Sequence, residues 1–241
     1  MELTKIKGNT YYINAPTNIG VYSFKNKNCL LIDTGINNSA AKKIDEVLKI
    51  NNLHPKYIIN THSHHDHCGG NNYFKSNYTG AIVYASQKEK LYMENPELRA
   101  AMLYTSFPVK ELEVESKEVL VDQVLDYGFT KINDEKFEVI SLKGHSPESI
   151  GIITKDKLAK QVDRNINNIN NYLEQILLLL EKPMTKEDLL ESLVILNDLF
   201  ISFRQYHLNF SSMSAFLAYL TNKGEINYSV ENGKVYYYKA P

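Results

Sequence analysis

The chain has 241 residues, of which 43% are hydrophobic and 23% charged, with a formal net charge of -1 and two cysteines. These values indicate a globular chain of one large domain or two small ones, and they exclude a disordered protein, a disulfide framework and a strongly basic binder of polyanions. The longest aliphatic run, Ile176–Leu180, is far shorter than the roughly 20 residues of a membrane span, and the first residues lack the apolar core of a signal peptide, so a cytoplasmic protein is predicted.

The first 35 residues alternate short apolar segments with Gly, Pro and Asn, a pattern that predicts strands. Four strands are expected, at Leu3–Lys7, Tyr11–Asn14, Ile19–Phe24 and Cys29–Asp33. A helix should follow, capped by Ser39, with Ile44 and Leu48 on its apolar face. Pro55 is expected to end the connection, and Tyr57–Asn60 reads as a buried strand.

The stretch that follows this strand concentrates metal-binding side chains. Four histidines and one aspartate fall within residues 62–67, out of seven histidines in the whole chain. His62 and His64 alternate with Ser63, so in an extended segment their imidazoles point the same way and can share one ion. Asp66 and His67 come after a bend and can hold a second ion. The alternative is a polar loop that is rich in histidine by chance, but the clustering of the histidines favours a metal-binding site.

The glycine pair and the cysteine beside the histidines need separate interpretations. Gly69 and Gly70 are predicted to let the backbone turn tightly and begin a helix. Cys68 could be a further ligand, but alternation predicts that its side chain points away from that of its neighbour.

Strand and helix signals continue to alternate, which favours a layered α/β fold. A helix should begin near Asn71–Phe74, a strand should cover Ala81–Ala85, and Ser86–Met102 should be helical. Three further strands are expected at Val119–Val124, Phe137–Leu142 and Ile150–Thr154. His145 follows the second of these, within Gly144-His145-Ser146-Pro147-Glu148.

The pattern His-x-His-x-Asp-His followed by Gly-Gly resembles the metallo-β-lactamase-fold superfamily. Leu30-Leu31-Ile32-Asp33-Thr34-Gly35 is similar to its early strand ending in Asp-x-Gly, Asn18–Tyr22 to the strand before it, and the His145 segment to the one that carries its third histidine. The resemblance covers residues 1–157. It departs from the family at Glu148, where many members have Gly.

The resemblance implies an αββα sandwich over residues 1–159, possibly truncated, that binds one or two zinc ions. His62, His64 and His145 would hold one ion, and Asp66 with His67 would help to hold the other. Zinc is favoured over iron because imidazoles dominate and His64 stands where the di-iron branch has an acid. A metal-activated hydroxide, oriented by the catalytic Asp66, would attack an ester, thioester, lactone, β-lactam or phosphodiester bond of a small-molecule substrate. Residues 104–114 are a candidate substrate lid, or an ordinary surface loop.

Two elements of the family pattern are absent after residue 154. The chain has neither the Gly-Asp pair whose aspartate bridges both metals nor the last histidine, and His207 is the one histidine beyond His145. Asp156 and Asp163 are possible stand-ins for the aspartate. Either the chain is a shortened form, or a segment is missing after about Lys157; the second is favoured because missing strands would expose the sheet interior.

Residues 160–241 form a second, helical module. Helices are expected at 163–180, from a Thr185–Asp188 capping pair to about Phe200, and at Ser211–Asn222, followed by a hairpin around Asn232-Gly233. This order resembles a winged helix. The module has eight basic and nine acidic residues, and its expected recognition helix has no Lys or Arg, which argues against nucleic acid. Packing on the first domain, or a homodimer, is predicted instead.

Two rival functions stay open. One is a catalytically impaired metallo-fold protein with a structural or ligand-sensing role, and the other is a winged-helix regulator.

Overall fold

The computed structural model describes residues 1–104, 118–155 and 159–241, with the backbone alone for residues 159–168. The described part of the first unit, which ends at Leu158, contains two sheets. The larger sheet has the spatial order β1 (Leu3–Lys7), β2 (Thr10–Ile13), β3 (Ile19–Ser23), β4 (Asn28–Ile32), β5 (His54–Ile59), β6 (Ile82–Ala85) and β7 (Gln123–Val124). The strands from β1 to β4 pair antiparallel, and those from β4 to β7 pair parallel. The smaller, antiparallel sheet has the order β10 (Ile150–Ile153), β9 (Glu135–Ser141), β8 (Gly128–Ile132).

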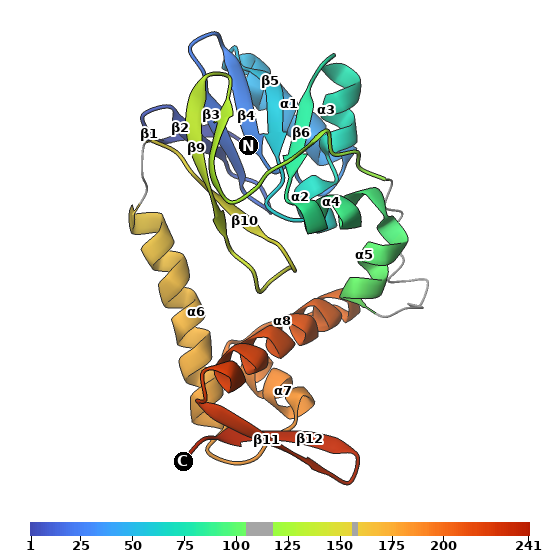
Figure 1. Cartoon of the computed structure of the whole chain (residues 1–241), viewed down its shortest axis with the longest axis vertical. Helices are drawn as coiled ribbons and strands as arrows, with labels where there is room; N and C mark the ends of the chain where they lie inside the picture. Colours follow the sequence, from blue (N-terminus) through green and yellow to red (C-terminus); the bar gives the residue numbers. More distant parts are fainter. Residues whose placement is uncertain (105–117, 156–158) are drawn as a thin grey trace. The chain divides into compact units, whose positions relative to one another are not determined.

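The helices of this unit connect the strands (Figure 1). They are α1 (Asn38–Ile50), α2 (His65–Cys68), α3 (Asn71–Asn77), α4 (Gln87–Glu94) and α5 (Pro96–Leu103). The parallel arrangement of β4, β5 and β6 brings the carboxyl ends of these strands to one edge of the sheet, where α/β folds place their chemistry.

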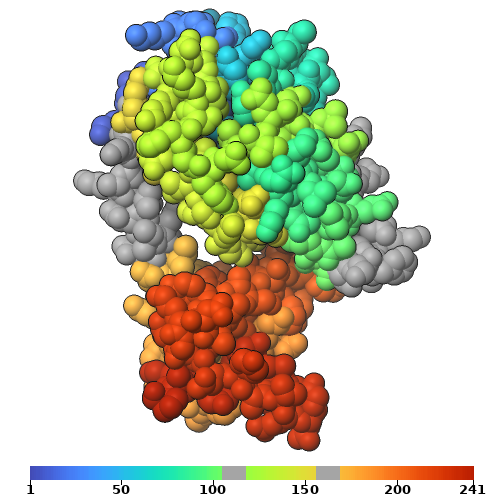
Figure 2. All heavy atoms as spheres, viewed as in Figure 1, coloured from blue at the N-terminus to red at the C-terminus, as the bar shows by residue number. Residues whose placement is uncertain are grey.

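Neighbouring residues of β4 face two different cores, because side chains alternate along a strand. Leu31 packs in one core with Ile44 of α1 and Phe74 of α3. Leu30 packs in the other with Phe137 and with residues of β8 and β10. The described layers are therefore helix, sheet and sheet, and the yellow-green atoms of the smaller sheet form much of the face of this unit seen in Figure 2. A strand buried on both faces has the continuous apolar run that predicted it.

Most predicted elements of this unit are present, and five details were wrong. The cap of α1 is Asn37, whose side chain accepts from the Ala40 amide, and not Ser39. Pro55 lies inside β5 instead of ending the connection before it. The expected single helix over 86–102 is two, because Asn95-Pro96 interrupts it. The strand predicted at 119–124 has only two residues, and β8 was not predicted at all.

The second unit covers Ala159–Pro241 and has its own core. Its elements are α6 (Ala159–Leu179), α7 (Lys186–Leu196), α8 (Phe203–Asn222) and the hairpin β11 (Ile226–Glu231) and β12 (Lys234–Lys239). Ile176, Leu189 and Leu217 bring the three helices together, and Met184 bridges to Tyr237 of β12. Among the described residues, no helix combines the length and the apolar character that crossing a bilayer requires.

The predicted hairpin and the Thr185–Asp188 capping box are confirmed. Three helix bounds were wrong. The helix α6 begins at Ala159, four residues before the expected start at 163, and α7 ends at Leu196, before Phe200. The helix α8 begins eight residues before Ser211, with Ser202 and Gln205 as a second capping box. The helix expected to have no Lys or Arg therefore contains Arg204. Ile176 is buried in this unit's own core, Leu173 and Leu177 pack against it, and the side chain of Ile166 lies outside the described part.

Candidate metal centre

The residues that follow β4, β5 and β9 meet at the carboxyl edge of the large sheet (Figure 1). Asp33 follows β4, Thr61 to His64 follow β5, and His145 lies in the connection from β9 to β10. The amide of Ile150 donates to the carbonyl of Thr61 at 2.9 Å, which ties the third of these segments to the second. Three segments far apart in sequence thus share one site.

His62, His64 and His145 converge into one cluster. One nitrogen from each ring lies within 4.8 Å of the others. The ring centroids are separated by 4.5 Å between His62 and His64, 4.8 Å between His62 and His145, and 4.5 Å between His64 and His145. His62 and His64 are buried and His145 is exposed, so the cluster opens to solvent on the side of His145.

The hydrogen bonds around His62 assign its tautomer. The Thr61 hydroxyl donates its one proton to Asp33 Oδ2 at 2.8 Å. The oxygen of that hydroxyl, Thr61 Oγ1, lies 2.9 Å from His62 Nδ1. His62 Nδ1 must therefore be the donor in the second contact. This leaves the lone pair on Nε2. A carboxylate that orients a ligand histidine in this way is a common support for a metal site.

Burial keeps the cluster neutral. Burial, and next the charge of His67, strongly lowers the pKa of His62, while burial and then His145 lower the pKa of His64 to about 3. Desolvation of its ring by the surrounding residues, and next the charge of His67, lower the pKa of His145. Neutral imidazole is the form that binds a metal ion.

The cluster fits a zinc ion by its unsatisfied atoms and its donor type. His62 Nε2 and His64 Nε2 are buried and have no hydrogen-bond partner among the described residues. A buried polar atom without a partner is costly, and a bound cation would satisfy both. Three imidazoles with one open side are the donor set of an open zinc site.

Residues 13–157 match the family described as the metallo-beta-lactamase superfamily, which is more than half of the chain. The chain belongs to this superfamily.

Two curated relatives are similar to parts of this chain. A hydroxyacylglutathione hydrolase of Pelagibacter ubique (strain HTCC1062) is 40% identical over 57 residues, which are 23% of this chain and 24% of that protein. The probable metallo-hydrolase YqgX of Bacillus subtilis (strain 168) is 26% identical over 157 residues, 65% of this chain and 64% of that one. The chain thus spans less than two thirds of the length of these curated relatives.

The crystal structure of a metallo-beta-lactamase family protein from Thermus thermophilus superposes with a TM-score of 0.65 at 16% identity. The match covers 95% of this chain and 97% of the other. This likeness supports the superfamily fold.

Asp66 and His67 lie beside the cluster but do not complete a second one. The described residues contain one group of three or more metal-binding side chains, and it consists of His62, His64 and His145. His67 Nδ1 donates to Asp33 Oδ2 at 2.7 Å, and His67 Nε2 lies 3.5 Å from Asp66 Oδ2. Burial alone would lower the pKa of His67, but the hydrogen bond and charge of Asp33, with Asp66, raise it overall.

The predicted helix begins directly after the two glycines of the motif, with Gly70 as the N-cap of α3, but the positions need glycine for a reason that was not predicted. Gly69 and Gly70 both have negative φ, which any residue adopts. A Cβ on Gly69 would lie 2.1 Å from the carbonyl oxygen of Ile36, and one on Gly70 would lie 2.4 Å from that of Thr34. The metal motif therefore needs glycine because two stretches of backbone approach closely there.

Four supporting residues were not predicted as part of the site. Asp33 and Thr61 orient His62 and His67, as described above. Glu89 and Arg99 are buried behind Ser63: the Ser63 amide donates to Glu89 Oε2 at 2.8 Å, and Arg99 Nη1 donates to the Ser63 carbonyl at 3.2 Å. Asp33 stood in a stretch that resembled the superfamily, whereas Glu89 and Arg99 gave no local signal because their burial depends on tertiary contacts.

The other candidate residues lie away from the cluster or outside the part of the chain that the structure describes. Cys68 is buried with its thiol 3.4 Å from the Ser63 carbonyl, outside the cluster. His207 belongs to α8 of the second unit. Asp156, the side chain of Asp163 and nearly all of the candidate lid at 104–114 lie outside the described residues.

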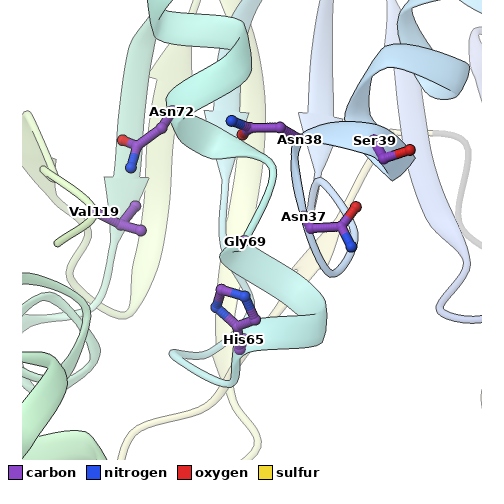
Figure 3. Close-up of a pocket in the computed structure, with 7 residues that line it drawn as sticks. All are labelled: Asn37, Asn38, Ser39, His65, Gly69, Asn72 and Val119. Atoms are coloured by element: carbon purple, nitrogen blue, oxygen red, sulfur yellow. The ribbon is translucent and has the colours of Figure 1, made fainter. Parts of the chain in front are cut away.

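His65, the remaining histidine of the motif, lines a separate polar pocket. Figure 3 shows His65 beneath Gly69, with Asn37, Asn38 and Ser39 of the α1 start on one side and Asn72 and Val119 on the other. None of the three converging histidines lines this pocket.

Proposed function

We propose that this chain is a zinc-dependent hydrolase whose ion is held by His62, His64 and His145. The observation that carries the proposal is the convergence of three neutral imidazoles, with one nitrogen of each within 4.8 Å of the others. A bound zinc ion would supply Lewis acidity, polarising the substrate's carbonyl or phosphoryl oxygen and lowering the pKa of a water molecule.

The protein's own groups then have distinct tasks. Asp33 and Thr61 hold the His62 ring in the tautomer that leaves Nε2 free. Asp66 has a carboxylate that is 45% exposed at the rim of the cluster, where it can orient the attacking water and accept its proton. Asp66 and His67 together are the proposed holders of a second ion.

Thioesters are the proposed first substrate class. The match to a hydroxyacylglutathione hydrolase supports this, since the acyl group of such a substrate is joined to sulfur. Esters, lactones, β-lactams and phosphodiesters stay in the panel because the superfamily fold alone does not select a bond. Two buried and unpaired cysteines fit the predicted reducing cytoplasm.

A turnover assay on the zinc-loaded chain tests the proposal. The panel contains an S-acyl glutathione thioester and one member of each other class, each assayed with wild type and His62→Ala. We expect hydrolysis of at least one substrate by wild type and its loss in the variant. Zinc-loaded wild type that turns over none of the panel would contradict the proposal and favour the structural or ligand-sensing alternative.

A further inference from the structure

A single buried carboxylate joins the two segments that carry the three histidines. Glu89, on the first turn of α4, is fully buried. Its Oε2 accepts from the amide of Ser63, which lies between His62 and His64, at 2.8 Å. Its Oε1 accepts from the Ser146 hydroxyl at 2.6 Å and from the Glu148 amide at 2.8 Å, directly after His145.

The connection is reciprocal. Glu148 Oε2 accepts from the Lys88 amide at 2.7 Å, and the Glu148 carbonyl accepts from the Ser86 hydroxyl at 2.8 Å. Glu148 therefore caps α4, whose own cap residue Ser86 makes no side-chain capping bond. The departure from the family pattern at Glu148 thus fixes the helix that presents Glu89. Both carboxylates lie at the amino end of α4, where the helix dipole favours negative charge.

The carbonyl of Ser63 is held by a second buried charge, the guanidinium of Arg99. Arg99 of α5 is 3% exposed, and its Nη1 donates to the Ser63 carbonyl at 3.2 Å. In the part of the chain that the structure describes, neither Glu89 nor Arg99 forms a direct ion pair. The backbone of Ser63 lies between them: its N–H donates to the carboxylate, and its C=O, in the next peptide group, accepts from the guanidinium. Arg99 Nη2 and the Ser63 hydroxyl are buried without a partner among the described residues, so the bonds to Glu89 and to Arg99 Nη1 are what hold the Ser63 backbone in place.

We propose that Glu89 is a positioning residue that sets His145 relative to His62 and His64. It acts through the Ser63 amide between His62 and His64, and through the Ser146 hydroxyl and the Glu148 amide after His145. The inference rests on the proposed function, since it assumes that the three histidines hold a metal ion. The Ile150–Thr61 backbone bond joins the same two segments, so the loops should stay near each other without Glu89 but lose their mutual register.

Glu89→Gln is the most direct test, because the side chain keeps its size and shape but loses at least one of the hydrogen bonds that the carboxylate accepts. Oε1 serves two donors and Oε2 serves one, so an amide NH2 in either place faces an N–H or O–H that needs an acceptor. Glu97→Gln on α5 is the matched control, since Glu97 is exposed. Ser146→Ala removes one of the three donors to Glu89, together with the contact between the Ser146 and Ser149 hydroxyls, and provides a milder second variant.

Zinc affinity is measured by competition with a chromophoric chelator, and the ligand geometry by the visible spectrum of the cobalt-loaded protein. We expect Glu89→Gln to lower zinc affinity by about 10- to 100-fold and to alter the cobalt spectrum. Ser146→Ala should change the zinc affinity and the cobalt spectrum in the same direction but less than Glu89→Gln does. Glu97→Gln should match wild type in both. If Glu89→Gln does not fold, Ser146→Ala carries the test.

Equal affinities and spectra for wild type and the folded variants would overturn the role of Glu89 alone. An equal loss in Glu97→Gln would also overturn it. Wild type that takes up neither ion would overturn the metal centre itself, so the two failures are distinguishable.

Discussion

Thr61 is the residue through which Asp33 reaches the first histidine. Its hydroxyl contacts both Asp33 Oδ2 and His62 Nδ1, so Thr61→Val should leave Nδ1–H without an acceptor and free the ring to change tautomer. We expect zinc affinity to fall by about 10- to 100-fold, as for other supports of metal ligands. Thr61→Ser keeps the hydroxyl and serves as the control. Chelator competition measures both, and a valine variant that binds as tightly as the serine variant would refute the assignment.

At this scale the sequence predicted the side chains with a local signature and missed those without one. His62, His64 and His145 were predicted from spacing and resemblance, and the structure brings them together. Glu89 and Arg99 lie on helices with no distinctive pattern, and their role depends on Ser63, about 30 residues earlier in the chain. Such partners become visible only once the chain has folded.

The start of α1 gives a prediction at the scale of the element, where sequence and structure disagree. Asn37 Oδ1 accepts from the Ala40 amide at 2.9 Å, while Ser39 lies within the helix. Asn37→Ala should therefore destabilise folding by about 1 kcal/mol, and Ser39→Ala by much less. Chemical denaturation of the two variants measures the difference. A larger loss in Ser39→Ala would restore the cap that the sequence predicted.

Elements with an unambiguous period were predicted well, and those shaped by partners were not. The four N-terminal strands and the Asn232-Gly233 hairpin lie within a residue or two of expectation. Strand β8 was missed because its outward Phe129 breaks the alternation. That ring is 68% exposed, with Lys136 Nζ 3.5 Å from its centre. Asn133 and Asp134, both with positive φ, form the turn from β8 to β9. An Asn-Asp pair is a turn signal that can be read from the sequence.

For the whole molecule, the association of the second unit stays a prediction. We expect a homodimer by light scattering, because isologous pairing is the commonest route to oligomers. Truncation after Lys160 should give an aggregating protein if residues 163–241 cover apolar surface of the first unit or of a second subunit. A soluble, monomeric truncation that keeps its zinc would contradict this expectation.

Nucleic-acid binding is the rival for the same module. Arg204 adds one cation to α8, but residues 160–241 still have a net charge of -1, which disfavours phosphate contacts. Submicromolar DNA binding at physiological salt would revive the winged-helix regulator.

The zinc content of the intact 27.7 kDa chain and of His62→Ala tests the central claim most directly. With three histidines in one cluster and two further candidate ligands beside it, we expect about one tightly held zinc per wild-type chain by elemental analysis. His62→Ala should lose most of that zinc while its circular dichroism stays that of wild type. Unchanged zinc content in a folded His62→Ala chain would contradict the account.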